Sequence, residues 1–269
     1  MAIISSRDNE LIKEYISLTG SAVRRRATRR FTLEGARLLS DALRSGIKIE
    51  NAFFTAQALR RYNDLAGEII VSSARLFEVN EQVALKLADT QSAQGIFCTA
   101  FMLDKKIELS KINIYGTYLA IENLQDPGNL GTMLRTAEAM GLDGAILSSN
   151  CADIWSPKVV RAAMGAIFRL PFIITEDLPN LFLSLREKNM RVIAAVVNSG
   201  ANSILNINLS CGVVVVVGNE GSGLSEECIN ACTELVTIPM RGRAESLNAA
   251  AAASILMWEL IRQKSQINL

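Results

Sequence analysis

Val213-Val-Val-Val-Val-Gly-Asn-Glu-Gly-Ser-Gly-Leu224 is the stretch of sequence that decides the fold. Its first five residues are β-branched and apolar, and such a continuous run predicts a central strand of a parallel sheet, buried on both faces. The glycine-rich turn that follows permits positive φ angles and a close approach of the backbone to a ligand. Asn219 and Glu220 lie inside this turn, so we expect a ligand-binding loop at the carboxyl end of the strand.

A second strand–loop–helix unit follows at Ile238-Pro-Met-Arg-Gly-Arg-Ala-Glu-Ser-Leu-Asn-Ala-Ala250. The pattern predicts a short strand at Ile238, a turn at Pro239, and a helix that begins near Ser246. An alanine-rich block favours continuation of this helix to about Arg262, because alanine is the best helix former. Two such units in succession predict a ligand pocket at the carboxyl ends of parallel strands.

Composition narrows the class of protein. The 269 residues are 49% hydrophobic, enough for one large or two smaller domains with a sizeable core. Charges or prolines interrupt every apolar run before it reaches bilayer length, and residues 1–10 are too polar for a secretory signal, so we expect a cytoplasmic protein without a membrane partner. The chain contains no histidine, which excludes Ser-His-Asp and Cys-His nucleophile pairs and histidine-based zinc catalysis. Cys228 and Cys232 share a predicted helix face without further ligands nearby, so no metal site is expected.

The formal net charge is +1, but one cluster, Arg24-Arg-Arg-Ala-Thr-Arg-Arg30, is strongly basic. Such a block is either a solvated surface or a phosphate-binding patch. The candidate RNA-binding residues are Arg24, Arg25, Arg26, Arg29 and Arg30.

The order of predicted elements indicates two parts. Residues 1–105 read as a small α/β module, residues 106–114 as a charged linker, and residues 115–269 as a larger domain with the order β-α-β-α-β-α-β-β-α. In the first part, the patterns predict helices over 8–18, 33–45, 56–65 and 74–88 and strands over 47–55, 68–72 and 95–102. In the second part, they predict strands over 117–122, 144–148, 191–197 and 213–217, and helices over 129–141, from Ser156, and from Ser246.

Asn123–Gly141, Val213–Leu224 and Ile238–Ala250 resemble, in order and spacing, the three signature motifs of the SpoU (TrmH-type) family of the SPOUT superfamily. Enzymes of this family transfer a methyl group from S-adenosylmethionine to a ribose 2′-hydroxyl in RNA. The resemblance covers roughly residues 115–262. Residues 1–105 are similar to the substrate-binding domain often found in front of this family, most clearly over Arg29–Leu39. The resemblance implies a C-terminal α/β domain with a parallel sheet, a deep trefoil knot, and a homodimer formed through the knotted region.

The resemblance also implies that S-adenosylmethionine is the cofactor, held by three loops and closed over by the start of the last helix. The glycine-rich loop lacks the Gly-Lys-Ser/Thr ending of an ATP-binding loop, as expected for a cofactor without phosphate. The implied cofactor-binding residues are Asn198, Ser199, Gly200, Gly218, Asn219, Glu220, Gly221, Ile238, Pro239, Met240, Leu247, Asn248 and Ala250.

The same motifs imply the catalytic residues Asn129, Arg135, Glu220, Ser246 and Asn248. The family assigns the position of Arg135 to the ribose hydroxyl, as base or as anchor. A guanidinium pKa above about 12 makes the base role costly, and the alternative is that Arg135 binds the adjacent phosphate and stabilises the forming alkoxide. Glu220 would then orient Arg135 or take the proton. Taken singly, Arg135 reads as a surface cation, Glu220 as the end of a turn, Ser246 as an N-cap and Asn248 as a solvated first-turn residue.

Three functions are therefore open. The front module of about 100 residues favours large-subunit ribosomal RNA as the substrate, since relatives that act on transfer RNA commonly carry only short basic extensions. A transfer-RNA 2′-O-methyltransferase and a catalytically silent RNA-binding protein are the alternatives. Retention of Arg135, Glu220, Ser246 and Asn248 speaks against the silent protein.

Overall fold

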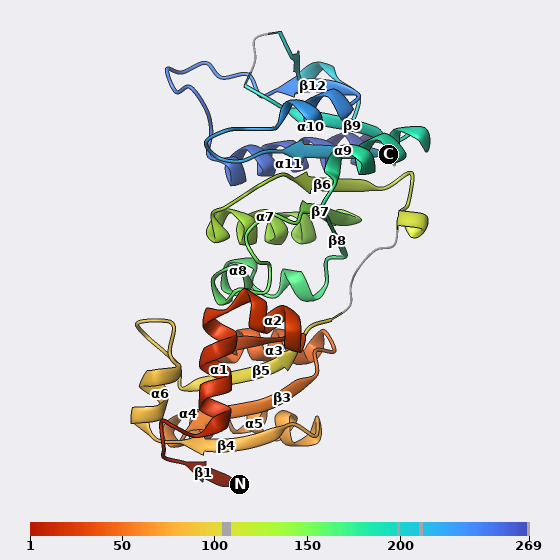
Figure 1. The fold of residues 1–269 in the computed structure, drawn as a ribbon. Helices are drawn as coiled ribbons and strands as arrows, with labels where there is room; N and C mark the ends of the chain where they lie inside the picture. The colour runs from red at the N-terminus through yellow and green to blue at the C-terminus, as the bar shows by residue number, and fades with distance from the viewer. Residues whose placement is uncertain (104–108, 198–199, 210–211, 268–269) are drawn as a thin grey trace. The chain divides into compact units, whose positions relative to one another are not determined.

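The computed structural model describes residues 1–103, 109–197, 200–209 and 212–267, and the chain divides into two compact units (Figure 1). The first unit contains residues 1–104 together with 155–168, and the second contains residues 105–154 and 169–269. The predicted linker lies partly outside the described residues; its described end holds the short 3₁₀ helix η1, Leu109–Lys111. The domain boundaries at 1–105, 106–114 and 115–269 stay predictions.

The first unit is built on a five-stranded sheet in the order β1-β4-β3-β5-β2. β5 runs antiparallel to both β2 and β3, and the other neighbours are parallel. Helices α1 and α6 pack on Phe53 and Phe97 of this sheet, and Figure 1 draws α1 across that face. The strands are β1 (Ala2–Ile4), β2 (Arg30–Glu34), β3 (Ile49–Thr55), β4 (Arg75–Val79) and β5 (Ile96–Phe101); the helices are α1 (Glu10–Gly20), α2 (Ala22–Thr28), α3 (Ala36–Arg44), α4 (Ala56–Arg61), α5 (Asn63–Val71), α6 (Glu81–Leu87), α8 (Pro157–Ala163) and η2 (Ala166–Phe168).

Three sequence predictions in this unit are wrong. Residues 68–72, predicted as a strand, lie mostly in α5, which buries Leu65, Ala66 and Ile69 at helical spacing. Residues 75–79, predicted as helical, form β4; the helix begins only after Asn80, whose side chain accepts from the Val83 amide. Residues 30–34 form β2, so the helix predicted from residue 33 begins at Ala36. These apolar runs are short, and periodicity alone does not separate a short buried strand from a short helix.

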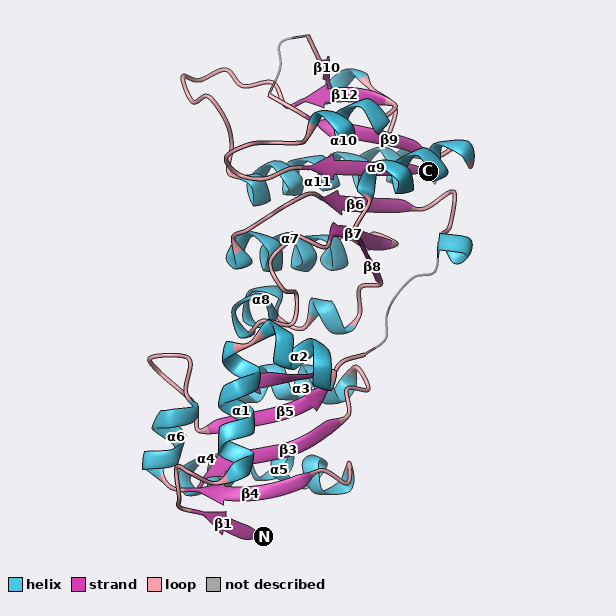
Figure 2. Ribbon diagram, viewed as in Figure 1, coloured by secondary structure: helices cyan, strands magenta, loops and turns pink. Residues whose placement is uncertain are grey.

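The second unit is an α/β domain with a seven-stranded parallel sheet in the order β10-β12-β9-β11-β6-β7-β8, drawn with its strands in magenta in Figure 2. β11 is Val213–Val217 and lies between β9 and β6 with all five valines buried, which confirms the predicted central strand. The remaining strands are β6 (Thr117–Ile121), β7 (Gly144–Ser148), β8 (Phe172–Thr175), β9 (Arg191–Ala195), β10 (Asn202–Ser203) and β12 (Glu234–Thr237).

Four helices flank this sheet. α9 (Leu178–Glu187) and α10 (Glu226–Ala231) pack on one cluster that contains Val192 and Val214. α7 (Pro127–Ala139) and α11 (Ala249–Ile267) contact each other. The predicted ranges contain no counterpart of β8, α9, β10 or α10. No helix in the described residues is both long and apolar enough to span a bilayer.

The last helix begins three residues later than predicted. α11 starts at Ala249, and the Oδ1 atom of Asn248 accepts from the backbone amides of Ala250 (2.9 Å) and Ala251 (3.2 Å). Asn248 therefore caps this helix, and Ser246 lies in the exposed loop before it.

Candidate active site

The three sequence motifs meet at one edge of the second sheet, where parallel strands end. Residues 122–126 follow β6, residues 218–225 follow β11, and residues 238–248 follow β12. The carboxyl ends of parallel strands are the usual place for a ligand in an open α/β sheet. The sequence predicted a ligand pocket at this place for the same reason, namely that two strand–loop–helix units end here.

Asn129 joins the three motifs by hydrogen bonds. Its Nδ2 atom donates to Oε1 of Glu220 (3.1 Å), and its Oδ1 atom accepts from Nδ2 of Asn248 (3.1 Å). Asp126 holds the start of α7, because its carboxylate accepts from the Asn129 amide at 2.7 Å and Pro127 occupies the first turn. The amide of Asp126 also donates to Glu220 Oε1 (3.3 Å). Residues that are about 90 to 120 positions apart in sequence thus form one polar cluster.

The glycine-rich loop is closed on itself and tied to β6. Asn219 and Gly223 exchange two backbone hydrogen bonds (2.9 and 3.0 Å), and Asn219 Oδ1 accepts from the Gly221 amide (2.9 Å). Asn219 Nδ2 donates to the carbonyl of Asn123 (2.8 Å) at the end of β6. A Cβ atom on Gly218 would lie 2.3 Å from the carbonyl carbon and oxygen of Gly223. The close pass of the backbone therefore requires glycine at residue 218.

Glu122 is a residue of this site that the sequence analysis did not single out. Its side chain is buried, with 6% of the residue exposed, and its two oxygens accept from the backbone amide (2.9 Å) and the hydroxyl (2.6 Å) of Ser225. Ser225 in turn caps α10 by accepting from the Cys228 amide (3.2 Å). Glu122 thereby fixes the end of the loop that carries Asn219 and Glu220. An acidic residue at the end of an otherwise apolar strand was the available signal, since buried carboxylates need partners.

We expect Glu122→Ala to weaken binding at the glycine-rich loop and to lower stability by about 2 kcal/mol, because Ser225 loses a charged acceptor in a partly buried place. Glu122→Gln keeps one acceptor and should recover part of both losses. Thermal unfolding and calorimetric titration with S-adenosylmethionine measure the two effects. If Glu122→Ala kept wild-type values in both, the anchoring role would be refuted; Leu147→Ala, a core change on β7, is the control for stability loss alone.

Arg135 lies on the exposed side of α7, while Leu130, Met133, Leu134 and Ala137 form its buried stripe. Within the described residues, the Arg135 side chain makes no hydrogen bond or ion pair, and Glu220 contacts Asn129 and Asp126 in its place. The orientation of Arg135 by Glu220 that the sequence suggested is absent from the described contacts. Ser246, in the exposed loop, likewise makes no described side-chain contact with this cluster.

A small apolar cavity of about 80 Å³ lies beside these loops, at the ends of β9 and β12. Ile238, Met240 and Leu247 were predicted to bind a cofactor and do line it; Val196, Thr237 and Ala252 line it too and were missed. Apolar walls suit the faces of a flat ring. Of the other predicted cofactor residues, Asn198 and Ser199 lie outside the described residues, Pro239 and Gly200 are exposed, and Ala250 is buried in α11.

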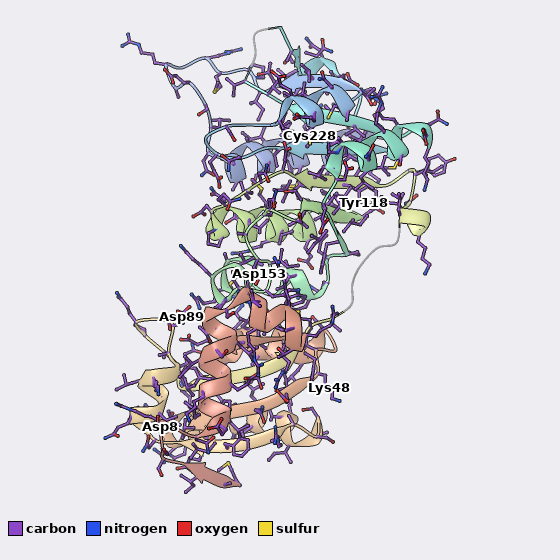
Figure 3. The ribbon with its side chains drawn as sticks, in the orientation of Figure 1. Asp8, Lys48, Asp89, Tyr118, Asp153 and Cys228 are labelled. Carbon is purple, nitrogen blue, oxygen red and sulfur yellow. The ribbon has the colours of Figure 1, made fainter. Side chains whose placement is uncertain are left out.

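The thiols of Cys228 and Cys232 are poorly suited to bind a metal ion. Burial, with a further contribution from a hydrogen bond to Glu122, raises the pKa of the Cys228 thiol to about 12, and burial raises the pKa of Cys232 to about 12. Figure 3 labels Cys228 in the second unit. Both thiols stay protonated at neutral pH, whereas metal ligands are thiolates. Among the described residues, no group of three or more Cys, Asp or Glu side chains is arranged to hold a metal ion.

The basic cluster in the first unit is only partly free for RNA. Arg25 is buried, with 4% exposed, and donates to the carbonyls of Leu18 (2.5 Å) and Thr19 (3.0 Å), so its place among the RNA-binding residues is corrected to a structural one. Arg24 pairs with Glu14 (2.7 Å), and Arg30 pairs with Glu14 (2.7 Å) and Glu50 (2.8 Å). Arg26 and Arg29 are exposed, and Arg29 ends α2 in the left-handed conformation with φ 54°.

Comparison with known proteins matches both units. The SpoU rRNA Methylase family model matches residues 116–258, and the MRM3-like substrate binding domain model matches residues 9–98. An uncharacterized tRNA/rRNA methyltransferase of Synechocystis sp. is 33% identical, over 98% of this chain and 95% of that protein. The 23S rRNA (guanosine(2553)-2′-O)-methyltransferase RlmP of Bacillus subtilis is 31% identical, over 97% of this chain and 99% of RlmP. The AdoMet-bound rRNA methyltransferase from Sinorhizobium meliloti superposes with a TM-score of 0.84 at 31% identity, over 96% of this chain and 97% of that chain.

Proposed function

This chain belongs to the SpoU rRNA Methylase family, and from that membership we propose that it transfers a methyl group from S-adenosylmethionine to a ribose 2′-hydroxyl of RNA. The observation that carries the proposal is the Asn129 cluster, in which residues of all three motifs contact one another beside an apolar cavity. The RNA is proposed to be large-subunit ribosomal RNA. RlmP, which is named for 23S rRNA, aligns with the front module as well as with the second unit.

The residues present fit the cofactor. The apolar cavity lined by Ile238, Met240 and Leu247 suits the adenine faces, and the exposed residues Glu220 and Gly221 offer backbone polar groups for its edges. When bound, the cofactor supplies a methyl group already activated by a sulfonium. The task of the chain is therefore to position the ribose hydroxyl in line and to help it lose its proton.

Arg135 and Glu220 divide that task in our proposal. The guanidinium of Arg135, which makes no described contact, holds the phosphate beside the target ribose and stabilises the forming alkoxide. In the described contacts, both donors to Glu220 reach Oε1, so Oε2 is free to accept the hydroxyl proton. Asn129 holds the Glu220 carboxylate in place, and Asn248 holds Asn129.

Incubation of the protein with methyl-tritiated S-adenosylmethionine and separated RNA fractions tests this function. We expect label in the large-subunit ribosomal RNA, located at a ribose 2′-oxygen by alkaline-resistance mapping. Label confined to transfer RNA would move the assignment to the transfer-RNA alternative. Absence of label from every RNA, including unmodified ribosomal RNA made by transcription, would favour the silent RNA-binding protein.

The basic cluster is proposed to contact RNA through Arg26, with Arg24, Arg29 and Arg30 nearby. Arg26→Ala should weaken RNA binding and reduce the slope of log affinity against log salt by about 1, because one phosphate contact is lost. Arg25→Ala is the matched control: it should lower stability, since one buried and one partly buried carbonyl lose their donor, and leave the salt slope unchanged in the folded fraction. Filter binding across a salt series measures the affinity and the salt slope of both variants. An unchanged slope for Arg26→Ala would show that the cluster is a solvated surface and does not bind RNA.

We propose further, from the resemblance, that the second unit contains a trefoil knot, that the protein is a cytoplasmic homodimer, and that the dimer forms through this unit. Apolar side chains at one face of α11 support the dimer, since Ile255 is 41% and Trp258 60% exposed. Sedimentation velocity is expected to show twice the 29.3 kDa chain mass. A monomer at micromolar concentration would rule the dimer out.

A further inference from the structure

The first unit contains a cavity of about 260 Å³, bounded by one side of α3, the end of β2 and the loop over residues 88–95. We propose that this cavity binds the base of one unpaired guanosine of the RNA substrate. The inference rests on the proposed function in one respect only, which is that RNA is the ligand of the chain. It assigns to the first unit a base-reading site in addition to the phosphate-contacting arginines.

Helix α3 supplies the groups that face the cavity. Arg37, Leu38 and Asp41 all line it, and Arg37 and Asp41 are one helical turn apart, so their side chains lie on the same side of the helix. Leu38 gives an apolar wall between them, and Met164 adds a second. The volume is below the range of about 300–1,000 Å³ that is usual for clefts that take drug-sized ligands, which favours a smaller planar group.

Arg37 and Asp41 are the charged lining groups that remain unused in the described structure. Glu34 accepts from the Asp89 amide (2.9 Å) and from the Thr90 hydroxyl, and Arg161 pairs with the Asp89 carboxylate (2.7 Å); Figure 3 labels Asp89 in the first unit. The side chains of Arg37 and Asp41 make no hydrogen bond or ion pair in the described part of the chain, not even with each other. One donor fork and one carboxylate are thus free at the cavity.

The charge of the lining favours a base over a phosphate. Two arginines and two acidic residues line the cavity, so their formal charges cancel. One amide at the start of α3 is also occupied, because Gln94 Oε1 accepts from the Ala36 backbone at 2.9 Å beside Gly35, which has φ +98°. Neither feature attracts an anion. Unpaired RNA bases are commonly splayed out and read by hydrogen bonds at their edges, with side chains against their faces.

Among the four bases, guanine complements this pair of free groups. Its O6 and N7 atoms are adjacent acceptors, and an arginine fork is their commonest specific partner. Its N1 and N2 positions are donors, which a carboxylate accepts. Adenine would turn its N6 donor toward the arginine, and uracil and cytosine lack the paired acceptors of the purine edge. Arg37 is therefore assigned to O6 and N7, and Asp41 to N1 and N2.

The test uses the full-length protein and fluorescein-labelled five-residue oligouridylates with a central guanosine, adenosine, inosine or 7-deazaguanosine. Inosine lacks the N2 donor, and 7-deazaguanosine lacks the N7 acceptor. Fluorescence anisotropy at one salt concentration should show guanosine bound about tenfold more tightly than adenosine, with inosine and 7-deazaguanosine in between. Equal affinities of the wild-type protein for guanosine and adenosine overturn the proposal, whatever any variant does.

Variants locate the two contacts. Asp41→Ala should bind guanosine and inosine equally, and Arg37→Ala should bind guanosine and 7-deazaguanosine equally. Arg44→Ala removes a charge from the same helix outside the cavity and should keep the full preference for guanosine. A guanosine preference that survives both Asp41→Ala and Arg37→Ala places the base elsewhere and overturns the assignment. Methyl transfer without a guanosine preference refutes this inference alone, whereas a guanosine preference without methyl transfer refutes the proposed activity alone.

Discussion

Gly218→Ala is expected to weaken S-adenosylmethionine binding about a hundredfold while the sheet stays folded. The new Cβ atom would meet the Gly223 carbonyl at 2.3 Å and the Leu224 amide nitrogen at 2.5 Å, and these are backbone atoms that no side-chain rotation relieves. The loop must open, and Asn219 and Glu220 move with it. Overpacking of this kind costs about 3 kcal/mol, which corresponds to roughly a hundredfold loss of affinity.

Calorimetric titration with the cofactor measures the loss, and circular dichroism checks the fold. Gly67→Ala is the matched control, because nothing lies within 4 Å of a Cβ at that helical position, and it should bind like the wild type. Wild-type affinity in Gly218→Ala would mean that the glycine-rich loop does not contact the cofactor.

Arg135→Ala is expected to lower kcat for methyl transfer by a factor of about 10² to 10³, the usual effect of removing one group that stabilises developing negative charge. Cofactor affinity should stay unchanged, because Arg135 does not line the apolar cavity. Stability should change by less than about 0.5 kcal/mol, since the side chain is exposed and makes no described contact. Single-turnover transfer to the identified RNA, with a parallel calorimetric titration, separates these quantities.

Arg135→Lys distinguishes two ways in which the arginine acts. A lysine keeps the charge but not the planar fork, so it should recover only part of the rate if two-point contact with a phosphate matters. Full transfer activity in Arg135→Ala would show that the catalytic assignment is wrong.

The sequence predicted the second unit better than the first, for physical reasons. The five consecutive valines of β11, followed by glycine, are a strong strand signal, and the apolar stripe along the 13 residues of α7 is a strong helix signal. The structure confirms both elements. In the first unit, the Ile-Ile-Val run of α5 and the short strand β4 are too brief for periodicity to decide, and tertiary packing selected the outcome.

For the site too, the sequence predicted some residues and not the contacts between them. Motif spacing indicated Asn129, Glu220 and Asn248, and the structure brings these three together. Spacing did not indicate that Asn129 hydrogen-bonds to both Glu220 and Asn248. It also did not indicate that the buried Glu122 anchors the glycine-rich loop through Ser225. Arg25 looks identical to its neighbours in sequence, and only its burial in the folded unit separates a structural arginine from those left at the surface.

We propose that the loops after β6, β11 and β12 form a binding site for S-adenosylmethionine. Isothermal titration of the full-length, folded protein with S-adenosylmethionine and with S-adenosylhomocysteine tests it most directly. We expect saturable binding of both compounds at one site per chain, about a hundredfold weaker in Gly218→Ala and unchanged in Arg135→Ala. Absence of binding for both compounds, with and without RNA present, would contradict it.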